Sequence, residues 1–332
     1  MPLARAMHAD GSEFMRPARE REAVRPLKCR VSVLVTAYNH VRFITQAVES
    51  TVGQRTDFAY EVVIGEDCST DGTREILLSL RHKYPDKIRL LLRQRNLGNV
   101  ANLAETLGSC RGEYVALLDG DDYWTSPAKL QRQVDFLDSH PEFSSCAHDV
   151  LIVDESGRIV VDGEPRRRSH VIDLPRMLSS DSVRTASVMF RRGLFAELPS
   201  WYRTVLVGDW PLHVLNLRHG NMWYDAHVFA AYRIHSGGLW SSAAFVSRRL
   251  ARIDVYHRLN AELGFAHDRL IRRRIARQYL ALAEHYAREH DVARMRESVR
   301  QAVQTGGWNP HLLLHRAFLR LVPPLLKART VR

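Results

Sequence analysis

The sequence has few cysteines and no long apolar run, and each absence excludes a class of protein. Four cysteines among 332 residues are widely spaced and form no Cys-x-x-Cys pair, so neither a zinc site nor a disulfide framework is expected. No apolar run approaches the roughly 18 residues needed to cross a bilayer, and we expect no secretory signal. Reduced thiols are typical of a cytoplasmic protein, which is the location we expect.

Positive charge is concentrated at one end of the chain. The formal net charge is +11; residues 248–332 hold 18 Lys and Arg against 7 Asp and Glu, whereas residues 1–247 hold 30 of each. A basic appendage suits an anionic membrane face, and it suits an Arg-rich helical surface in solvent equally well. We therefore expect a basic helical region over residues 247–332, with peripheral contact with the inner face of the cytoplasmic membrane as one hypothesis.

The first residues are set apart from the fold. Gly11-Ser12-Glu13-Phe14 resembles a cloning scar and precedes Met15, which is then a candidate natural start. Residues 1–28 are accordingly expected to be a disordered extension, derived in part from cloning.

Apolar segments typical of buried strands alternate with segments of helical periodicity from residue 31 to residue 137. Strands are expected at 31–35, 61–64, 88–92 and 114–118, with Asn39 as the cap of the first helix and Ser126-Pro127 opening the fourth. Beyond residue 143 the pattern predicts short strands, a helix over Pro211–Leu217 and a helical hairpin over 275–305. The further strands are expected at 143–147, 150–153, 159–161, 186–190, 222–224 and 229–232. This alternation predicts an α/β fold with a Rossmann-like, mostly parallel sheet, helices on both faces and a C-terminal helical appendage.

Polar side chains follow three of the predicted strands. Asn39 follows the first strand, Asp67 the second, and the acidic turn Asp119-Gly120-Asp121-Asp122 the fourth. The carboxyl ends of parallel strands share one sheet edge, where ligands bind in such folds. Asp119 and Asp121 are spaced to converge on Mg²⁺ or Mn²⁺, which in turn bridges to substrate phosphates. The alternative for an isolated Asp-Gly-Asp is a solvated acidic turn.

Taken in order, these motifs resemble the inverting family 2 glycosyltransferases, which have a GT-A fold. The resemblance rests on Thr36-Ala37-Tyr38-Asn39, on the Ser-Thr-Asp-Gly turn within residues 66–73, on Asn96-Leu97-Gly98 with Asn102, and on the Asp-x-Asp strand end. It covers roughly residues 30–240 and implies a GT-A domain over residues 29–246. The implied donor is a nucleotide-diphosphate sugar, most simply a UDP-sugar, and the implied acceptor is a hydroxyl of a glycan or a lipid-linked glycan. Cell-surface glycan or polysaccharide synthesis is the implied setting.

The resemblance also assigns roles to residues. A divalent cation would be held by Asp121, with Asp119 and His235 as further candidates, and Asp67 would accept the N3–H of a uracil-type base. The residues expected to bind the nucleotide sugar are Thr36, Tyr38, Asn39, Asp67, Asn96, Gly98, Asn102, Asp119, Gly120, Asp122 and Arg233.

Inverting transfer requires a general base for the acceptor hydroxyl. The resemblance points to Asp209, although Gly208 stands where the family usually has an acidic residue; a plain helix cap before Pro211 is the alternative. Thr185-Ala186-Ser187 resembles the segment that faces the acceptor in this family.

Three other functions would require motifs or charge patterns that differ from those of this sequence. A haloacid-dehalogenase-like phosphatase also carries Asp-x-Asp, but normally after its first strand. A dinucleotide-dependent oxidoreductase would need a Gly-x-Gly-x-x-Gly motif after the first strand, which this sequence lacks. A nucleic-acid-binding protein would need a basic groove, which an acidic sheet edge within a neutral region does not provide.

Overall fold

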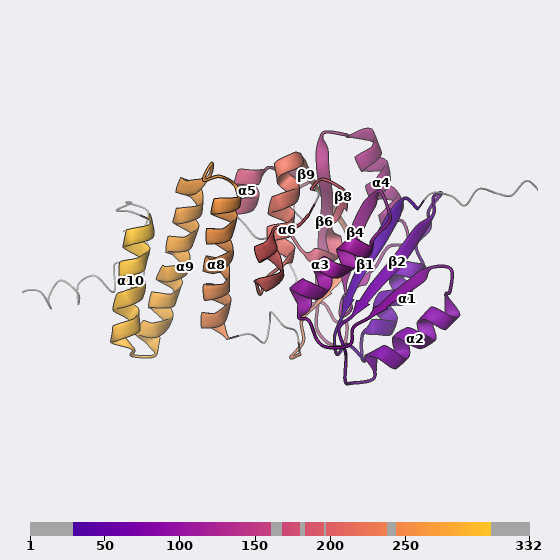
Figure 1. The fold of residues 1–332 in the computed structure, drawn as a ribbon, viewed down its shortest axis with the longest axis horizontal. Helices are drawn as coiled ribbons and strands as arrows, with labels where there is room; N and C mark the ends of the chain where they lie inside the picture. The colour runs from indigo at the N-terminus through magenta and orange to yellow at the C-terminus, as the bar shows by residue number, and fades with distance from the viewer. Residues whose placement is uncertain (1–28, 161–167, 180–182, 196, 238–243, 307–332) are drawn as a thin grey trace, which may run out of the picture.

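The described part of the chain forms a nine-stranded mixed sheet with helices on both faces and three long helices at the C-terminal end (Figure 1). The computed structural model describes residues 29–160, 168–179, 183–195, 197–237 and 244–306. The strands are β1 (Val31–Ala37), β2 (Tyr60–Glu66), β3 (Ile88–Leu92), β4 (Tyr114–Asp119), β5 (Tyr123–Trp124), β6 (Phe143–Val153), β7 (His170–Ile172), β8 (Met189–Arg191) and β9 (Asn221–Arg233). The helices are α1 (Ile44–Val52), α2 (Thr73–Lys83), α3 (Asn99–Ser109), α4 (Lys129–Ser139), α5 (Leu174–Ser179), α6 (Asp209–Asn216), α8 (Phe245–Glu262), α9 (Asp268–Arg288) and α10 (Val292–Gly306). Three 3-10 turns complete the elements: η1 (Thr185–Ser187), η2 (Ser200–Thr204) and η3 (Leu217–His219).

The strand order is β3-β2-β1-β4-β8-β6-β9-β5, with β7 paired to β9. The first four strands are parallel, whereas β8 runs antiparallel to both β4 and β6. In this register Thr36 pairs with Gly65 on one side and with Asp119 on the other. The ends of β2, β1 and β4 therefore lie together at one edge of the sheet, as the sequence predicted.

The central strands are apolar throughout because both faces of the sheet are covered. Alternate strand residues such as Leu34 and Leu117 join one core cluster with side chains of α3, α6 and α8. Their neighbours, such as Val35 and Leu118, join a second cluster with side chains of α1, α2 and α4. The predicted α/β fold with a mostly parallel sheet is confirmed.

Several predicted boundaries are wrong in detail. The strands expected at 143–147 and 150–153 are one strand, β6, and those expected at 222–224 and 229–232 are one strand, β9. Strands β6 and β9 pair with each other, and the pairing contains register shifts. Each strand can therefore continue past polar residues that, in the sequence, indicated the end of a strand. The expected strand over 186–190 begins only at Met189, because residues 185–187 form η1. Ile159 forms a single bridge to Val153, and residue 161 lies outside the described residues.

Two predicted helix starts are also corrected. Asn39 does not cap α1, which begins at Ile44 after a turn; instead Asn39 has a positive φ of 55°. Helix α4 begins at Lys129, and the Ser126 hydroxyl accepts the Ala128 N–H before the helix at 3.3 Å. Both polar residues satisfy backbone groups in the connecting loops rather than in the first helical turn.

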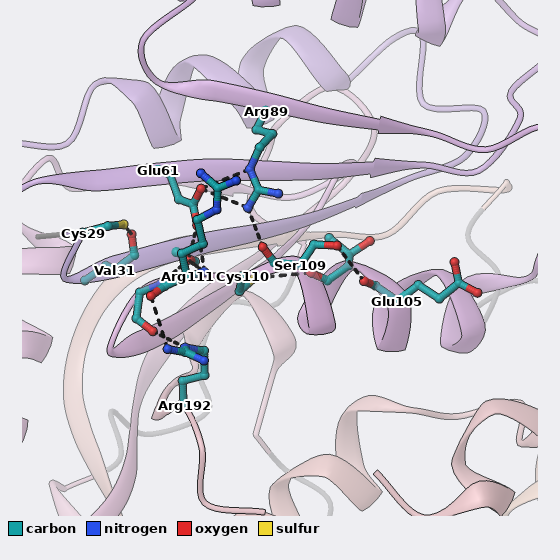
Figure 2. Close-up of polar contacts among 12 residues, drawn as sticks. Cys29, Val31, Glu61, Arg89, Glu105, Ser109, Cys110, Arg111 and Arg192 are labelled. Carbon is teal, nitrogen blue, oxygen red and sulfur yellow. Dashed lines mark hydrogen bonds and ion pairs between the residues drawn. The ribbon is translucent and has the colours of Figure 1, made fainter. Parts of the chain in front are cut away.

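The edge opposite the polar clusters is fixed by a charged network (Figure 2). Glu61 accepts hydrogen bonds from the Arg89 guanidinium at 3.0 Å and from the Arg111 backbone N–H at 2.9 Å. Its other contact is the Ser32 hydroxyl at 2.7 Å. These bonds tie β1, β2, β3 and the loop before β4 together, so the parallel strands end in register at the polar edge.

Helices α8, α9 and α10 lie side by side, at the opposite end of the molecule from α2 (Figure 1). Helix α8 begins at Phe245, close to the predicted boundary at residue 247, and buries Tyr256 and Leu259 in the cluster that covers the sheet. Within the described residues no helix is both long and apolar enough to span a membrane. Residues 1–28 and 307–332 lie outside the described residues, so the predictions that concern them stay predictions.

Candidate active site

The acidic turn at the end of β4 is built around Gly120. The Gly120 N–H donates to the Thr36 carbonyl oxygen at 2.8 Å, and the Asp122 N–H closes the turn on the Asp119 carbonyl at 3.1 Å. A Cβ atom at residue 120 would lie 2.7 Å from His40 Nδ1 and 3.0 Å from the Thr36 oxygen. Only glycine allows this close approach, which explains the Asp-Gly-Asp spacing.

Asp121 faces two imidazole rings. Its Oδ2 lies 3.0 Å from His235 Nε2 and 3.8 Å from His40 Nε2. Burial alone would raise the pKa of Asp121, but the His235 hydrogen bond and the charges of both histidines outweigh it and lower the pKa. The sequence predicted His235 at this site and missed His40; the only available signal was its position directly after Asn39.

Asp119 lies beside Asp121 in a different environment. Its Oδ1 accepts the Thr36 hydroxyl at 2.7 Å. Burial, the negative charge of Asp121 and, less strongly, that of Asp209 raise the pKa of Asp119 to about 7. The pKa values of Asp119 and Asp121 are therefore shifted in opposite directions. Shifts of this kind are typical of functional sites, and a bound cation would stabilise both carboxylates in their charged form.

The last residue of the turn, Asp122, is hydrogen-bonded to Arg233 at the end of β9. Asp122 is 2% exposed, and its Oδ1 accepts the Arg233 backbone N–H at 2.8 Å. Burial and the charges of Asp121 and Asp119 raise the pKa of Asp122 well above its usual range. The Arg233 guanidinium donates to the backbone oxygens of Asp121, Asp154 and Glu155 and to the side chain of Gln46. These contacts join the turn to β9. Direct contact of Asp122 or Arg233 with a nucleotide sugar stays a prediction.

The loop after β1 is joined to the Ser-Thr-Asp-Gly turn after β2. The Asn39 N–H donates to the Ser69 hydroxyl at 3.0 Å, and Asn39 Oδ1 accepts the Thr70 N–H at 2.9 Å. The Asp71 carboxylate in turn accepts the Val41 N–H at 2.9 Å. These bonds fix the short loop that carries Tyr38 and His40 to the sheet edge.

Asp67 lies at the same edge and holds the loop before α3. It is 2% exposed, and its two oxygens accept the N–H groups of Leu97 at 2.7 Å and Gly98 at 3.0 Å. Asn96 Oδ1 also accepts the Gly98 N–H, at 2.8 Å. Asp67 therefore positions the loop before α3, and its recognition of a base remains a prediction.

Asn102 is buried where α3 packs on β2. It is 1% exposed and donates from Nδ2 to the Gly65 carbonyl at 2.7 Å. Its Oδ1 accepts the Arg93 guanidinium at 3.1 Å. The side chain joins α3 to β2 beneath the site, and nucleotide-sugar contact by Asn102 stays untested.

Asp209 reaches the site from the first residue of α6. Its Oδ2 accepts the Thr185 hydroxyl at 3.2 Å, and its charge acts on Asp119. A Cβ at residue 208 would lie 2.9 Å from Val100 Cγ1, and the residue's carbonyl accepts the buried Tyr202 hydroxyl at 2.7 Å. Crowding thus explains why glycine, rather than the usual acidic residue, precedes Asp209.

The carboxylate oxygens at the acidic turn are the kind of ligand that a hard divalent cation prefers. Within the described residues no group of three or more His, Cys, Asp or Glu side chains is arranged so that it could hold a metal ion by itself. A cation that uses one or two carboxylates and completes its coordination with diphosphate oxygens and water needs no such group. Of the ligands that the sequence nominated, Asp121 and His235 lie 3.0 Å apart, and a metal-binding role for these two residues and for Asp119 stays a prediction.

The comparisons with known proteins place the chain in a family. The model of glycosyl transferase family 2 matches residues 32–198, and the chain belongs to this family. Uncharacterized protein Rv1520 of Mycobacterium tuberculosis is 37% identical over 220 residues, which cover 66% of this chain and 62% of that protein. The chain thus spans less than two thirds of that relative's length. The succinoglycan biosynthesis protein ExoO of Rhizobium meliloti is 30% identical over 164 residues, 48% of this chain and 43% of that one.

Solved glycosyltransferases share the fold. S. aureus TarS 1-349 in complex with UDP-GlcNAc has a TM-score of 0.55 at 20% identity, covering 84% of this chain and 93% of that one. The mannosyltransferase PcManGT from Pyrobaculum calidifontis, in complex with GDP-Man and Mn²⁺, has a TM-score of 0.55 at 16% identity, covering 93% and 85%. The GT-A fold and the family resemblance are confirmed, and the comparisons support neither a phosphatase nor a nucleic-acid-binding protein.

Proposed function

We propose that this chain is a metal-dependent inverting glycosyltransferase that moves a sugar from a UDP-sugar to an acceptor hydroxyl. The proposal is carried by the acidic turn that ends β4 next to β1, where Asp121 Oδ2 lies 3.0 Å from His235 Nε2. Asp209, the first residue of α6, accepts the Thr185 hydroxyl at 3.2 Å in the neighbouring η1 turn. A donor-binding group and a candidate base then flank one reaction centre. The UDP-GlcNAc complex of TarS and the Mn²⁺ complex of PcManGT, each a property of that protein, support the choice of donor class and metal.

Donor binding would use the three strand ends. Asp121, with Asp119 and His235, would hold Mg²⁺ or Mn²⁺, which supplies charge neutralisation for the diphosphate as it departs. Tyr38 and Thr36 would line the base pocket beside Asp67. In this proposal the buried contacts of Asp122 and Arg233 keep the turn in the position that binding requires.

Transfer would use Asp209. The acceptor oxygen attacks the anomeric carbon and gives its proton to the Asp209 carboxylate as the new C–O bond forms. The bond from the anomeric carbon to the diphosphate breaks at the same time, and its electron pair leaves with the nucleotide diphosphate. Attack from the face opposite the leaving group inverts the anomeric configuration.

The proposal is tested by screening nucleotide sugars for diphosphate release. UDP-glucose, UDP-galactose, UDP-N-acetylglucosamine and GDP-mannose are each incubated with Mn²⁺, with Mg²⁺ or with EDTA, with and without glycan acceptors. Release of UDP from at least one UDP-sugar only when a cation is present supports the proposal. Phosphate release from a monoester without turnover of any nucleotide sugar would favour a phosphatase.

The acceptor and the location are further parts of the proposal. Glycan or lipid-linked acceptors assembled at the cytoplasmic membrane face suit the basic excess of residues 248–332. We expect the full chain to bind anionic liposomes at low salt and to be released by added salt. Equal binding to neutral and anionic liposomes, or none to either, would remove this part of the proposal.

A further inference from the structure

The Thr185 hydroxyl contacts the carboxylate of the proposed base. Thr185 Oγ1 donates to Asp209 Oδ2 at 3.2 Å. Asp209 is the first residue of α6, so this bond joins the start of that helix to the η1 turn. A threonine hydroxyl has one proton to donate, and in this structure it goes to the carboxylate of α6.

The other hydroxyl of the same turn is not available for this role. Ser187 is fully buried, and its Oγ donates to the Arg184 carbonyl oxygen at 2.7 Å. Ala186 between them is also fully buried. Of the Thr185-Ala186-Ser187 segment, the Thr185 side chain is therefore the one that reaches the reaction centre.

The backbone that carries Thr185 is fixed from two sides. The Trp124 indole N–H, two residues beyond Asp122, donates to the Ala186 carbonyl at 3.0 Å. The Gln133 amide of α4 donates to the Ser187 carbonyl at 2.9 Å. Both donors are at most 5% exposed, so water competes little for these bonds. The hydroxyl is thus held in register with the acidic turn rather than placed by a loose loop.

We infer that Thr185 is a positioning residue that orients the Asp209 carboxylate toward the acceptor. The inference rests on the proposed function, because it takes Asp209 as the base. A carboxylate turns broadly about its last side-chain bond, and a fixed donor on Oδ2 restricts that rotation and leaves Oδ1 for the acceptor proton. The Thr185 hydroxyl acts through Asp209 and touches neither the sugar nor the diphosphate.

The test compares Thr185→Val, which removes the hydroxyl at nearly constant volume, with Thr185→Ser, which keeps it. Turnover is measured with the nucleotide sugar of the panel that gives the fastest Mn²⁺-dependent diphosphate release. Loss of one orienting hydrogen bond is expected to lower kcat about tenfold in Thr185→Val, with KM for the donor within about twofold. Thr185→Ser is expected to retain most of kcat.

A double variant distinguishes the positioning role of Thr185 from the proposed role of Asp209 as the base. In the Asp209→Asn background, Thr185→Val is expected to cause no further loss, because the group it orients is already inactive. Wild-type kcat in Thr185→Val, or a further tenfold loss in the double variant, would overturn the inference. So would a loss of Mn²⁺–UDP affinity by Thr185→Val, measured by calorimetry, since the hydroxyl would then act on Asp119. Full turnover by Asp209→Asn alone would instead contradict the proposed base.

Discussion

Three neighbouring carboxylates in the acidic turn have three different environments. Asp121 faces two histidines, which lower its pKa. Asp119 is half-buried, and desolvation together with the charge of Asp121 raises its pKa to about 7. Asp122 is 2% exposed, and desolvation raises its pKa well above the usual range. Sequence spacing alone could nominate all three as ligands. Their different surroundings depend on which way each side chain points, which the spacing does not reveal.

Asp121 is expected to be indispensable for cation binding. Asp121→Asn keeps the size and one oxygen but removes the charge, so affinity for Mn²⁺ in the presence of UDP should fall at least tenfold, as should turnover. Calorimetry with Mn²⁺ and UDP measures the effect. Asp86→Asn, an exposed charge far along the chain, is the matched control and should bind as wild type does. Unchanged affinity in Asp121→Asn would move the cation site elsewhere.

Lys129 makes stability depend on pH. The amine is fully buried, donates to Gln133 Oε1 at 2.6 Å, and burial lowers its pKa to about 7. In the unfolded chain the amine stays protonated to about pH 10, so above pH 7 the unfolded state binds more protons and the free energy of unfolding rises with pH.

Lys129→Met is expected to remove this dependence. Between about pH 7 and pH 9 the free energy of unfolding of the wild type should rise by about 1 to 3 kcal/mol relative to that of the variant. Urea unfolding of both proteins at each pH gives the difference. Parallel pH profiles would show that the folded state keeps the amine charged.

The junction of β2 and α3 depends on a buried amide. Asn102 donates to the Gly65 carbonyl and accepts from Arg93, so Asn102→Ala leaves the buried Gly65 carbonyl and the half-buried Arg93 guanidinium without this partner. We expect the free energy of unfolding to fall by about 1 to 3 kcal/mol. Ser79→Ala on the exposed face of α2 is the control, with a change within about 0.5 kcal/mol. Equal stability of the two variants would mean that water replaces the lost bonds.

The sequence predicted the first half of the sheet well and the second half less well. Strands β1 to β4 are short apolar runs bounded by polar turns, and their local pattern contains nearly all the information that places them. Strands β6 and β9 were each predicted as two pieces, because polar residues such as Asp149 and Asp225 interrupt the apolar pattern. Their pairing over register shifts is a non-local property that no short window encodes.

The candidate site shows the same limit. Asp119 and Asp121 could be nominated because they follow an apolar strand at a spacing that suits a cation, and Asp209 could be nominated from the family resemblance. His40 was missed because its approach to Asp121 arises from the bend after β1, where Asn39 has a positive φ. The contact of Thr185 with Asp209 joins segments that are 24 residues apart and depends on tertiary packing.

Across the whole molecule, the C-terminal helices are tied to the site through α6. The Tyr256 ring of α8 packs at 4.9 Å against that of Trp210, the residue after Asp209, and its hydroxyl accepts the Arg274 guanidinium at 2.8 Å. Helix α10, in contrast, packs on α9 through small clusters of its own. The predicted appendage therefore supports the candidate base structurally, whatever its role at a membrane.

Tyr256→Ala tests this support. Removing a large buried side chain should lower the free energy of unfolding by about 3 to 5 kcal/mol. Because α6 loses a packing partner at its first turn, kcat should fall while affinity for Mn²⁺–UDP is retained. Arg258→Ala removes only an exposed ion pair with Asp254 and is expected to change stability by less than about 1 kcal/mol. If Tyr256→Ala kept the stability and turnover of the wild type, the C-terminal helices would not support the site through α6.

The central claim is that the acidic turn binds a divalent cation together with a nucleotide diphosphate. Crystals soaked with MnCl₂ and UDP, measured near the manganese absorption edge, test it most directly. The account predicts an anomalous peak within coordination distance of Asp121, with diphosphate oxygens as further ligands and the uracil beside Asp67. UDP bound away from this edge, or well-ordered UDP with no manganese beside Asp121, would contradict it.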